Sequence, residues 1–154
     1  MARRFVPQTG QTDYTHIRWA PVINCVVQRG GKILLVQRSK ELQFYPECWN
    51  GISGFLDNHR SLEEKVQDEL HEELGIGYEN IVSITPGTVF DQDEPAYNKT
   101  WIVHPVLVQV KTEKIALDWE ATTHRWVSPT DARTMKLLPG FDRVLNTFFR
   151  SGAA

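Results

Sequence analysis

A short acidic helix predicted between Ser61 and Gly75 is the feature that most constrains this chain. Ser61 followed by Glu64 is a capping-box pattern, in which each side chain satisfies a free backbone N–H of the other residue. Gly75 can adopt the left-handed conformation that ends a helix. Between these two ends, four apolar residues recur at every fourth position and form one stripe: Leu62, Val66, Leu70 and Leu74.

Three carboxylates lie along the edge of this apolar stripe. Glu69, Glu72 and Glu73 are spaced i, i+3 and i+4, so a helix places them on one face. Like charges arranged in this way repel, by about 0.2–0.5 kcal/mol per pair in an isolated helix, so we expect a positive charge to compensate them. A hard divalent cation that takes oxygen ligands, such as Mg²⁺, is the natural candidate. The alternative is an acidic surface helix whose carboxylates are simply solvated.

The residues before the helix extend the pattern. Residues 54–76 read GFLDNHRSLEEKVQDELHEELGI. This stretch resembles the signature of the Nudix hydrolase family, G-x5-E-x7-R-E-U-x-E-E-x-G-U, in which U is a bulky apolar residue. Gly54 takes the position of the first glycine, and the later fixed positions are matched by Glu69, Leu70, Glu72, Glu73, Gly75 and Ile76. In the family, the three glutamates hold the divalent metal.

Two positions depart from the signature. Arg60 stands where the family has its first glutamate, and Asp68 stands where it has its arginine. Because these substitutions are reciprocal in charge, we expect Arg60 and Asp68 to form an ion pair that ties the loop to the helix. The alternative is that both positions have relaxed because the protein no longer needs full catalytic geometry.

The resemblance continues on both sides of the helix. Residues 49–54 resemble the family's W-x-x-x-G-G lead-in, and residues 32–38 resemble its strand that ends in an arginine, here Arg38. Downstream, Glu120 precedes Trp126 by six residues, as a loop glutamate does in the family. In several members that glutamate is a general base or an extra metal ligand.

The resemblance implies a pyrophosphohydrolase that needs Mg²⁺ or Mn²⁺ and cleaves a phosphoanhydride bond in a nucleoside diphosphate linked to another group. Metal held by Glu69, Glu72 and Glu73 would bridge to phosphate oxygens, stabilise the developing charge and lower the pKa of bound water. Glu120, or a helix glutamate not fully engaged by the metal, would then remove the proton. The predicted catalytic residues are therefore Glu72, Glu73 and Glu120.

Three residues are predicted to bind the substrate. Arg38 is placed to neutralise a phosphate, although a structural ion pair at the strand end is an equal alternative. Trp49-Asn50-Gly51 resembles an element of family members that sanitise oxidised purine nucleoside triphosphates, where the asparagine contacts the base. On that analogy Asn50 would hydrogen-bond a nucleobase, and Trp49, Phe44 or Tyr45 would stack on it. The alternative is that Trp49 packs in the core and Asn50 shapes a turn.

Composition limits the remaining classes of function. A chain of 154 residues suits one domain, and a net charge of −2 does not favour nonspecific nucleic-acid binding. No stretch approaches the ~20 apolar residues of a membrane span, and no apolar run follows Arg3 and Arg4 as in a signal peptide. We therefore expect a cytoplasmic protein whose partner is a nucleotide-like small molecule. The sequence leaves a homodimer open.

The expected fold class is α/β, a Nudix-like α/β/α sandwich with a mixed β-sheet. Residues 1–15 are expected to form a flexible arm, and residues 16–154 a single domain. The apolar runs predict strands over residues 17–28 and 32–38, joined by a hairpin, and near residues 81–90, 101–110 and 124–127, with a helix over residues 140–150.

Two other functions remain as alternatives. One is a non-catalytic Nudix-like nucleotide-binding regulatory module, which the departures at Arg60 and Asp68 favour and the intact glutamates oppose. The other is an isopentenyl diphosphate isomerase-like enzyme. That branch relies on an active-site cysteine in a characteristic setting, which Cys48 before Trp49 does not reproduce.

Overall fold

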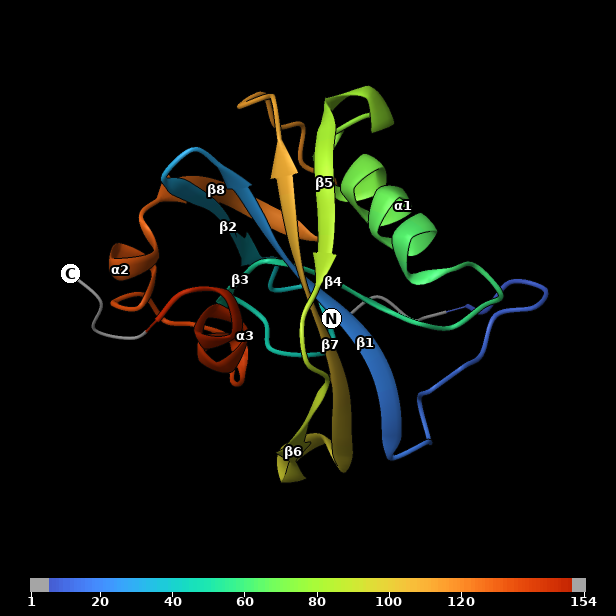
Figure 1. The fold of residues 1–154 in the computed structure, drawn as a ribbon. Coiled ribbons are helices and arrows are strands. Elements are labelled where there is room, and N and C mark those ends of the chain that lie inside the picture. The colour runs from blue at the N-terminus through green and yellow to red at the C-terminus, as the bar shows by residue number, and fades with distance from the viewer. Residues whose placement is uncertain (1–5, 151–154) are drawn as a thin grey trace.

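Two long strands run parallel through the centre of the structure, a computed structural model that describes residues 6–150 (Figure 1). They are β1 (Trp19–Arg29) and β7 (Lys99–Val110). Val26, Val27 and Val106 in these strands have no solvent exposure. Consecutive buried residues such as Val26 and Val27 point to opposite faces of the sheet, so this pair is covered on both faces and belongs in the middle of a layered fold.

Antiparallel strands extend this pair into a mixed sheet. They are β2 (Lys32–Arg38), β3 (Trp49–Asn50), β4 (Ile52–Phe55), β5 (Ile81–Pro86), β6 (Phe90–Glu94) and β8 (Ala121–Val127). The order across the eight-stranded sheet is β3-β2-β1-β7-β5, with β4 beside β1, β6 beside β7 and β8 beside β2. The predicted hairpin between β1 and β2 is confirmed, because these strands pair up to Arg29 and Lys32 around Gly30-Gly31.

Helices lie on both sides of the sheet (Figure 1). The helix α1 covers one face, and α2 and α3 cover the other. This arrangement confirms the predicted α/β fold with a mixed sheet between helical layers. No helix within residues 6–150 has the length and apolar character needed to cross a lipid bilayer. The helical bounds are α1 (Leu62–Leu74), α2 (Pro129–Ala132) and α3 (Phe141–Phe148), with 3₁₀ turns η1 (Tyr78–Asn80) and η2 (Pro95–Tyr97).

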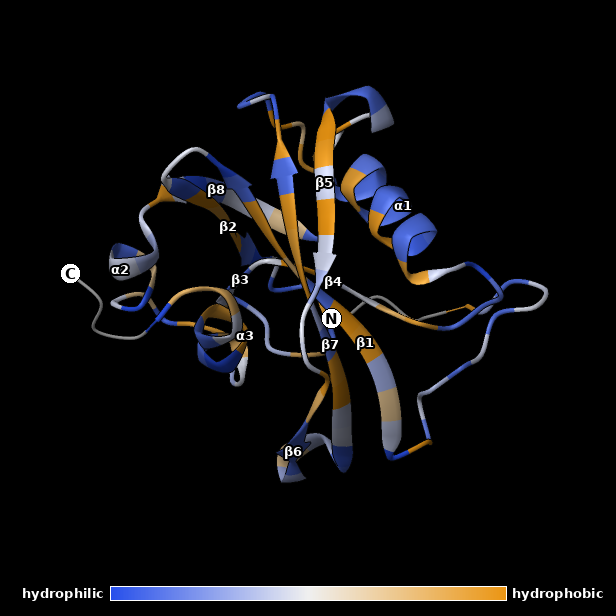
Figure 2. Cartoon of the chain, viewed as in Figure 1, coloured by the Kyte–Doolittle hydropathy of each residue, from blue (hydrophilic) through white to orange (hydrophobic). Residues whose placement is uncertain are grey.

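Each helical layer packs on its own apolar core. The apolar stripe of α1 faces the sheet (Figure 2) and joins one buried cluster with residues such as Ile23 and Val108. On the opposite face, Phe141 and Val144 of α3 join a second cluster with Val26. Burial of these apolar surfaces fixes both helices against the sheet.

The ends of α1 are those predicted from the sequence. Ser61 accepts a hydrogen bond from the Glu64 N–H at 3.2 Å, and Glu64 accepts one from the Ser61 N–H at 3.0 Å. Gly75 has a φ of 68°, and its N–H donates to the carbonyl of His71. The capping box and the left-handed glycine thus confirm the predicted helix.

One predicted strand is divided in two. Residues 81–90 form β5 and the start of β6, and both strands pair with β7 at different places. Pro86 ends β5, where it cannot donate a ladder hydrogen bond. Gly87 then lies so close to α3 that an added Cβ would be 2.5 Å from a Thr147 carbon. The short strands β3 and β4 and the one-turn helix α2 carry too few residues to show a periodic pattern.

The N-terminal segment contacts the loop that leads into α1. The backbone N–H of Thr12 donates to the Asp57 carbonyl at 2.7 Å, and Gln11 Nε2 donates to Asp57 Oδ2 at 2.7 Å. The ring of Tyr14 stacks on Phe55 with centroids 5.4 Å apart. In the expected flexible arm, residues 11–14 therefore lie against the domain, while residues 1–5 lie outside the described residues.

Candidate active site

A cleft of about 840 Å³ lies beside α1, and two groups of side chains line it. Residues from α1, from β1 and β4, from the loop before β8 and from the N-terminal segment all contribute. The acidic wall consists of Glu69, Glu72, Asp118 and Glu120. The aromatic wall consists of Phe44, Tyr45, Phe55 and Trp101.

Gly54 allows Glu69 to lie against β4. A Cβ added at Gly54 would be 2.8 Å from Glu69 Cδ and 2.9 Å from Glu69 Oε1. Any larger residue at this position would displace the carboxylate, because real Cβ atoms do not approach so closely. The first glycine of the motif therefore leaves the space that the carboxylate of Glu69 occupies.

Glu73 carries an oxygen without a partner. The residue is half-buried, but its Oε2 is shielded from solvent and has no hydrogen bond. Burial raises the pKa of Glu73 well above its usual value, and the charges of Glu120 and Glu69 raise it further. Leaving a buried acceptor unsatisfied costs free energy, about 1–3 kcal/mol and more for a charged group. A cation at this oxygen would remove that cost.

Glu120 lies in the turn before β8. Its N–H donates to Asp118 Oδ1 at 2.9 Å, and its carbonyl accepts from the Ser39 N–H at 2.8 Å. Burial, together with the Asp118 and Glu69 charges, raises the pKa of Glu120 to about 7, and the Arg38 charge opposes this shift. A carboxylate that titrates near neutral pH is well suited to accept a proton in catalysis.

Arg38 faces the helix carboxylates from the end of β2 and lines the cleft. Its Nε and Nη2 donate to the Phe44 carbonyl at 3.1 and 2.8 Å. Burial lowers the pKa of Arg38, while the charges of Glu73 and Glu120 oppose that shift. Arg38 therefore holds the backbone at residue 44 through hydrogen bonds and also places a cation in the cleft, where its predicted role at a phosphate stays a prediction.

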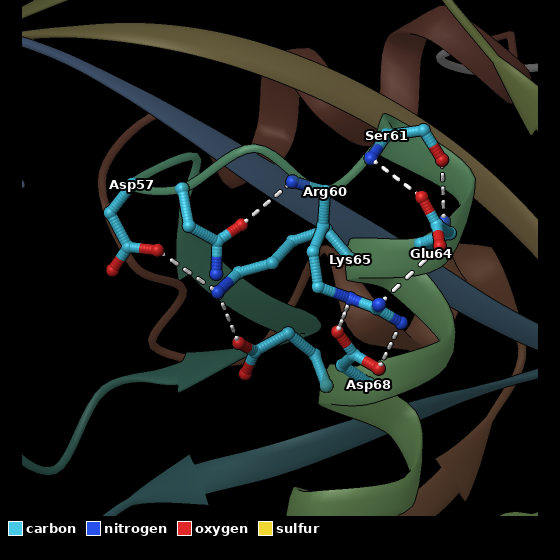
Figure 3. A network of polar contacts seen from close by, with 8 residues as sticks. Asp57, Arg60, Ser61, Glu64, Lys65 and Asp68 are labelled. Carbon is cyan, nitrogen blue, oxygen red and sulfur yellow. Dashed lines mark hydrogen bonds and ion pairs between the residues drawn. The ribbon is translucent and has the colours of Figure 1, made fainter. Parts of the chain in front are cut away.

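A lysine that the sequence analysis did not single out lies among these acids. Lys65 Nζ is 3.2 Å from Asp57 Oδ1 and 3.4 Å from Glu69 Oε1, and Figure 3 shows it reaching from α1 toward Asp57. Burial alone would lower the pKa of Lys65, but the Glu69 and Asp57 charges outweigh it and raise the pKa above its usual value. The i, i+4 spacing of Lys65 and Glu69 in the sequence predicts their contact on a helix, but no spacing predicts the contact of Lys65 with Asp57.

The predicted pair between Arg60 and Asp68 is confirmed. Arg60 Nε is 2.5 Å from Asp68 Oδ2, and its Nη2 is 3.0 Å from Asp68 Oδ1, so the contact is bidentate (Figure 3). Arg60 also lies 3.4 Å from Glu64. The reversed charges therefore still tie the loop to the helix, as expected from their reciprocal exchange.

The structure does not bring Trp49 and Asn50 to the cleft, because neither side chain lines it. Trp49 is half-buried in β3 and packs against the cluster beneath α3. Asn50 has no solvent exposure. Its Oδ1 accepts from Asn24 Nδ2 at 3.1 Å and its Nδ2 donates to Ser53 Oγ at 3.3 Å. Internal hydrogen bonds therefore occupy the Asn50 amide.

The aromatic wall supplies the apolar surface instead. Phe44 lies edge-on to Trp101 with ring centroids 5.1 Å apart, and Phe55 lies 6.1 Å from Trp101. Trp101 Nε1 donates to the Tyr45 hydroxyl at 2.9 Å. These rings come from the loop after β2, from β4 and from β7, so no local sequence pattern could group them.

The carboxylates suit a hard divalent ion by their chemistry, since they offer oxygen donors and one of them is unsatisfied. As the side chains stand, no three His, Cys, Asp or Glu residues of the described chain converge on one point. Glu69 instead contacts Lys65, with its Oε1 3.4 Å from the Lys65 Nζ. Binding an ion therefore requires these side chains to turn toward it.

Comparisons with known proteins agree with this geometry. The sequence profile of the NUDIX domain matches residues 18–148. The NAD-capped RNA hydrolase NudC of Chromobacterium violaceum is 32% identical over 78 residues, which are 51% of this chain and 28% of that protein. The chain therefore spans about a quarter of the length of that curated relative.

Solved structures show the same fold. The MutT NUDIX hydrolase from Burkholderia pseudomallei superimposes with a TM-score of 0.72 at 21% identity, covering 85% of this chain and 98% of that one. The NUDIX domain of Shewanella oneidensis NrtR, complexed with ADP ribose, gives 0.71 at 16% identity, with 90% and 92% covered. A C. elegans Ap4A hydrolase binary complex gives 0.67 at 18% identity, with 84% and 94% covered.

Proposed function

Because the chain belongs to the Nudix hydrolase family, we propose that it is a divalent-metal-dependent pyrophosphohydrolase. Its substrate class is a nucleoside diphosphate linked to another group, and the reaction is hydrolysis of the phosphoanhydride bond. The observation that carries the proposal is the unpartnered Glu73 Oε2, whose pKa is raised by burial and by the charges of Glu120 and Glu69, two residues that line a cleft with an aromatic wall.

Glu69, Glu72 and Glu73 are the proposed metal ligands, and the ion is Mg²⁺ or Mn²⁺. When bound, such an ion polarises phosphate oxygens and lowers the pKa of a bound water. The three carboxylates project from one face of α1. A substrate diphosphate is anionic, so these residues attract it only when the ion reverses the local charge.

Glu120 is the proposed general base. Its pKa of about 7 lets it accept a proton near neutral pH, and it lines the cleft, whereas Glu73 does not. Glu72 also lines the cleft. Glu72 is the alternative general base if one of its carboxylate oxygens does not bind the ion. Arg38 is proposed to neutralise a phosphate oxygen, because it lines the cleft and its guanidinium is held in place by the Phe44 carbonyl.

The aromatic wall is proposed to stack on the nucleobase. Phe44 and Phe55 are half-buried rings that line the cleft, and aromatic rings bind bases through stacking worth about 1–3 kcal/mol per base. Among the relatives named above, NudC is a hydrolase of NAD-capped RNA and the C. elegans protein is a hydrolase of Ap4A. The NrtR domain is complexed with ADP ribose. Each of these molecules has a nucleoside joined to a second group through a phosphoanhydride, which supports the same class here.

A regulatory nucleotide-binding module is the second candidate function. The departures at Arg60 and Asp68 favour it, and a Nudix domain complexed with ADP ribose is among the similar structures. The bidentate Arg60–Asp68 contact weakens that case, because the tie between loop and helix is kept. The isomerase alternative gains no support, since Cys48 is buried and does not line the cleft.

A substrate panel separates these functions. Nucleoside triphosphates, ADP ribose, NADH, dinucleoside polyphosphates and NAD-capped RNA are incubated with the protein and Mg²⁺ or Mn²⁺, and then with EDTA. Metal-dependent release of a nucleoside monophosphate from at least one compound is the expected result. Tight binding of a nucleotide with no release from any compound would identify the regulatory module instead.

A further inference from the structure

Lys65 forms a buried ionic cluster with two carboxylates from different parts of the chain. Its ammonium contacts Asp57 in the loop after β4 and Glu69 one turn further along α1. The side chains of Lys65, Asp57 and Glu69 are 10%, 5% and 12% exposed. A lysine ammonium is a compact point charge, so at this depth its position is set by the anions around it.

Asp57 is itself fixed in place. Its Oδ1 contacts Lys65 and its Oδ2 accepts from Gln11 Nε2 at 2.7 Å, while its backbone carbonyl accepts from the Thr12 N–H. Glu69, by contrast, extends from the helix into the cleft without such backbone support. Asp57 is therefore an immobile anchor for the ammonium, and Glu69 is its second, exchangeable partner.

Lys65 and the divalent ion would compete for the carboxylate of Glu69. Its Oε1 forms an ion pair with Lys65 in this structure, and the same carboxylate is a proposed metal ligand. A cation held at Glu69 repels an incoming divalent ion and occupies one of the oxygens that the ion needs.

We propose that Lys65 sets the affinity of the site for its divalent ion, by competing for Glu69, and that Asp57 retains the ammonium when the ion binds. Lys65 and Asp57 are positioning residues in this scheme, and neither contacts the substrate. The inference rests on the proposed function, because it assumes that Glu69 binds metal.

Direct titration of Mn²⁺ tests the proposal without any activity measurement. Calorimetry or electron paramagnetic resonance gives the dissociation constant for the unaltered protein and for each variant. Lys65→Met removes the charge at similar side-chain length. We expect Mn²⁺ to bind about tenfold more tightly to this variant, because one nearby positive charge is gone.

Asp57→Asn provides the decisive comparison. It leaves the ammonium with Glu69 as its one charged partner, so we expect Mn²⁺ to bind several-fold more weakly, by about threefold to tenfold. A merely structural role predicts a different pattern. Both variants lose the same contact between loop and helix, so a structural role would shift metal affinity in the same direction in both.

Two further variants serve as controls for the loss of charge at Lys65. Lys32→Met removes an exposed positive charge at the turn between β1 and β2, away from the cleft, and should bind Mn²⁺ like the unaltered protein. Lys65→Gln keeps a hydrogen-bond donor without the charge and should reproduce the tighter binding. If both Lys65 variants bind like the unaltered protein, the inference is wrong while the proposed function stands. If the unaltered protein binds no Mn²⁺, the proposed function itself fails.

Discussion

Two sets of ion pairs connect the loop after β4 to α1, and they differ in exposure. The side chains of Arg60 and Asp68 are 45% and 32% exposed, whereas those of Lys65 and Asp57 are 10% and 5% exposed. An exposed pair contributes about 0–1 kcal/mol because water and salt screen it. A buried pair is costly to break because the remaining charge stays desolvated. The exposed pair therefore secures the loop weakly, and the buried pair controls the charge beside the proposed metal ligands.

The largest effect is expected at Glu73, the acid with the unpartnered oxygen. Glu73→Gln removes the charge at the unpartnered oxygen but keeps the shape of the side chain. Turnover should fall by about 10²–10³-fold, similar to the loss of one electrostatic stabiliser in other active sites. The fold should be retained, which circular dichroism would verify. Unchanged metal-dependent turnover in this variant would show that the negative charge of Glu73 does not contribute to catalysis.

The next effect concerns the proposed base. Glu120→Gln should lower kcat by about 10²-fold, within the range for loss of a general base. In the unaltered protein kcat should rise as pH increases through about 7, because the base form of Glu120 appears there. This rising limb should vanish in the variant. A pH profile with the same limb in both proteins would assign the proton transfer to another residue.

Glu120 should also make the stability of the fold depend on pH, and this stability should fall over the pH range in which kcat rises. Glu120 has its pKa raised from 4.5 to about 7 on folding, so the folded state binds the proton more tightly than the unfolded state. The stability contributed by this group is present below pH 4.5 and is lost as pH rises toward 7. Chemical denaturation in EDTA should therefore show a smaller loss of stability over this interval in Glu120→Gln than in the unaltered protein.

Breaking the buried pair should destabilise the protein more than breaking the exposed pair. Lys65→Met leaves Asp57 buried without its cation, and we expect a loss of about 3 kcal/mol in the free energy of unfolding in EDTA. Adding Asp57→Asn to this variant should recover part of that loss, since the unpaired charge is removed. If Lys65→Met lowers the free energy of unfolding by less than a substitution in the exposed Arg60–Asp68 pair does, then burial does not make the Lys65–Asp57 pair the costlier one to break.

The smallest effect belongs to the exposed pair. Arg60→Ala or Asp68→Ala should cost about 0.2–1 kcal/mol, and high salt should reduce that cost. Exchanging the two charges, with Arg60→Glu and Asp68→Arg together, should restore stability relative to either single exchange. A double exchange no better than the single ones would mean that the contact has no energetic value.

The sequence predicted the parts of this molecule that depend on local pattern. The capping box at Ser61, the glycine at Gly75 and the apolar stripe between them are properties of one continuous segment, and all are confirmed. The pair between Arg60 and Asp68 was also predictable, because a family pattern marked both positions. The requirement for glycine at position 54 follows from a contact with Glu69 that only the folded chain reveals.

The rest depends on contacts between distant segments. Asp57 reaches Lys65 because the N-terminal segment fixes the loop that carries it, and no spacing rule predicts that conformation. The aromatic wall combines rings from three separate segments. Asn50 was predicted to contact a base by analogy, but its amide is used in hydrogen bonds to Asn24 and Ser53.

Titration of Mn²⁺ into the unaltered protein and into Glu73→Gln tests the central claim most directly, because it measures ion binding by the carboxylates of α1 without reference to any substrate. The unaltered protein should bind the ion, and Glu73→Gln should bind it at least about tenfold more weakly while remaining folded. Equal affinity in the two proteins, or no binding in either, would contradict the assignment of these helix carboxylates as a metal site.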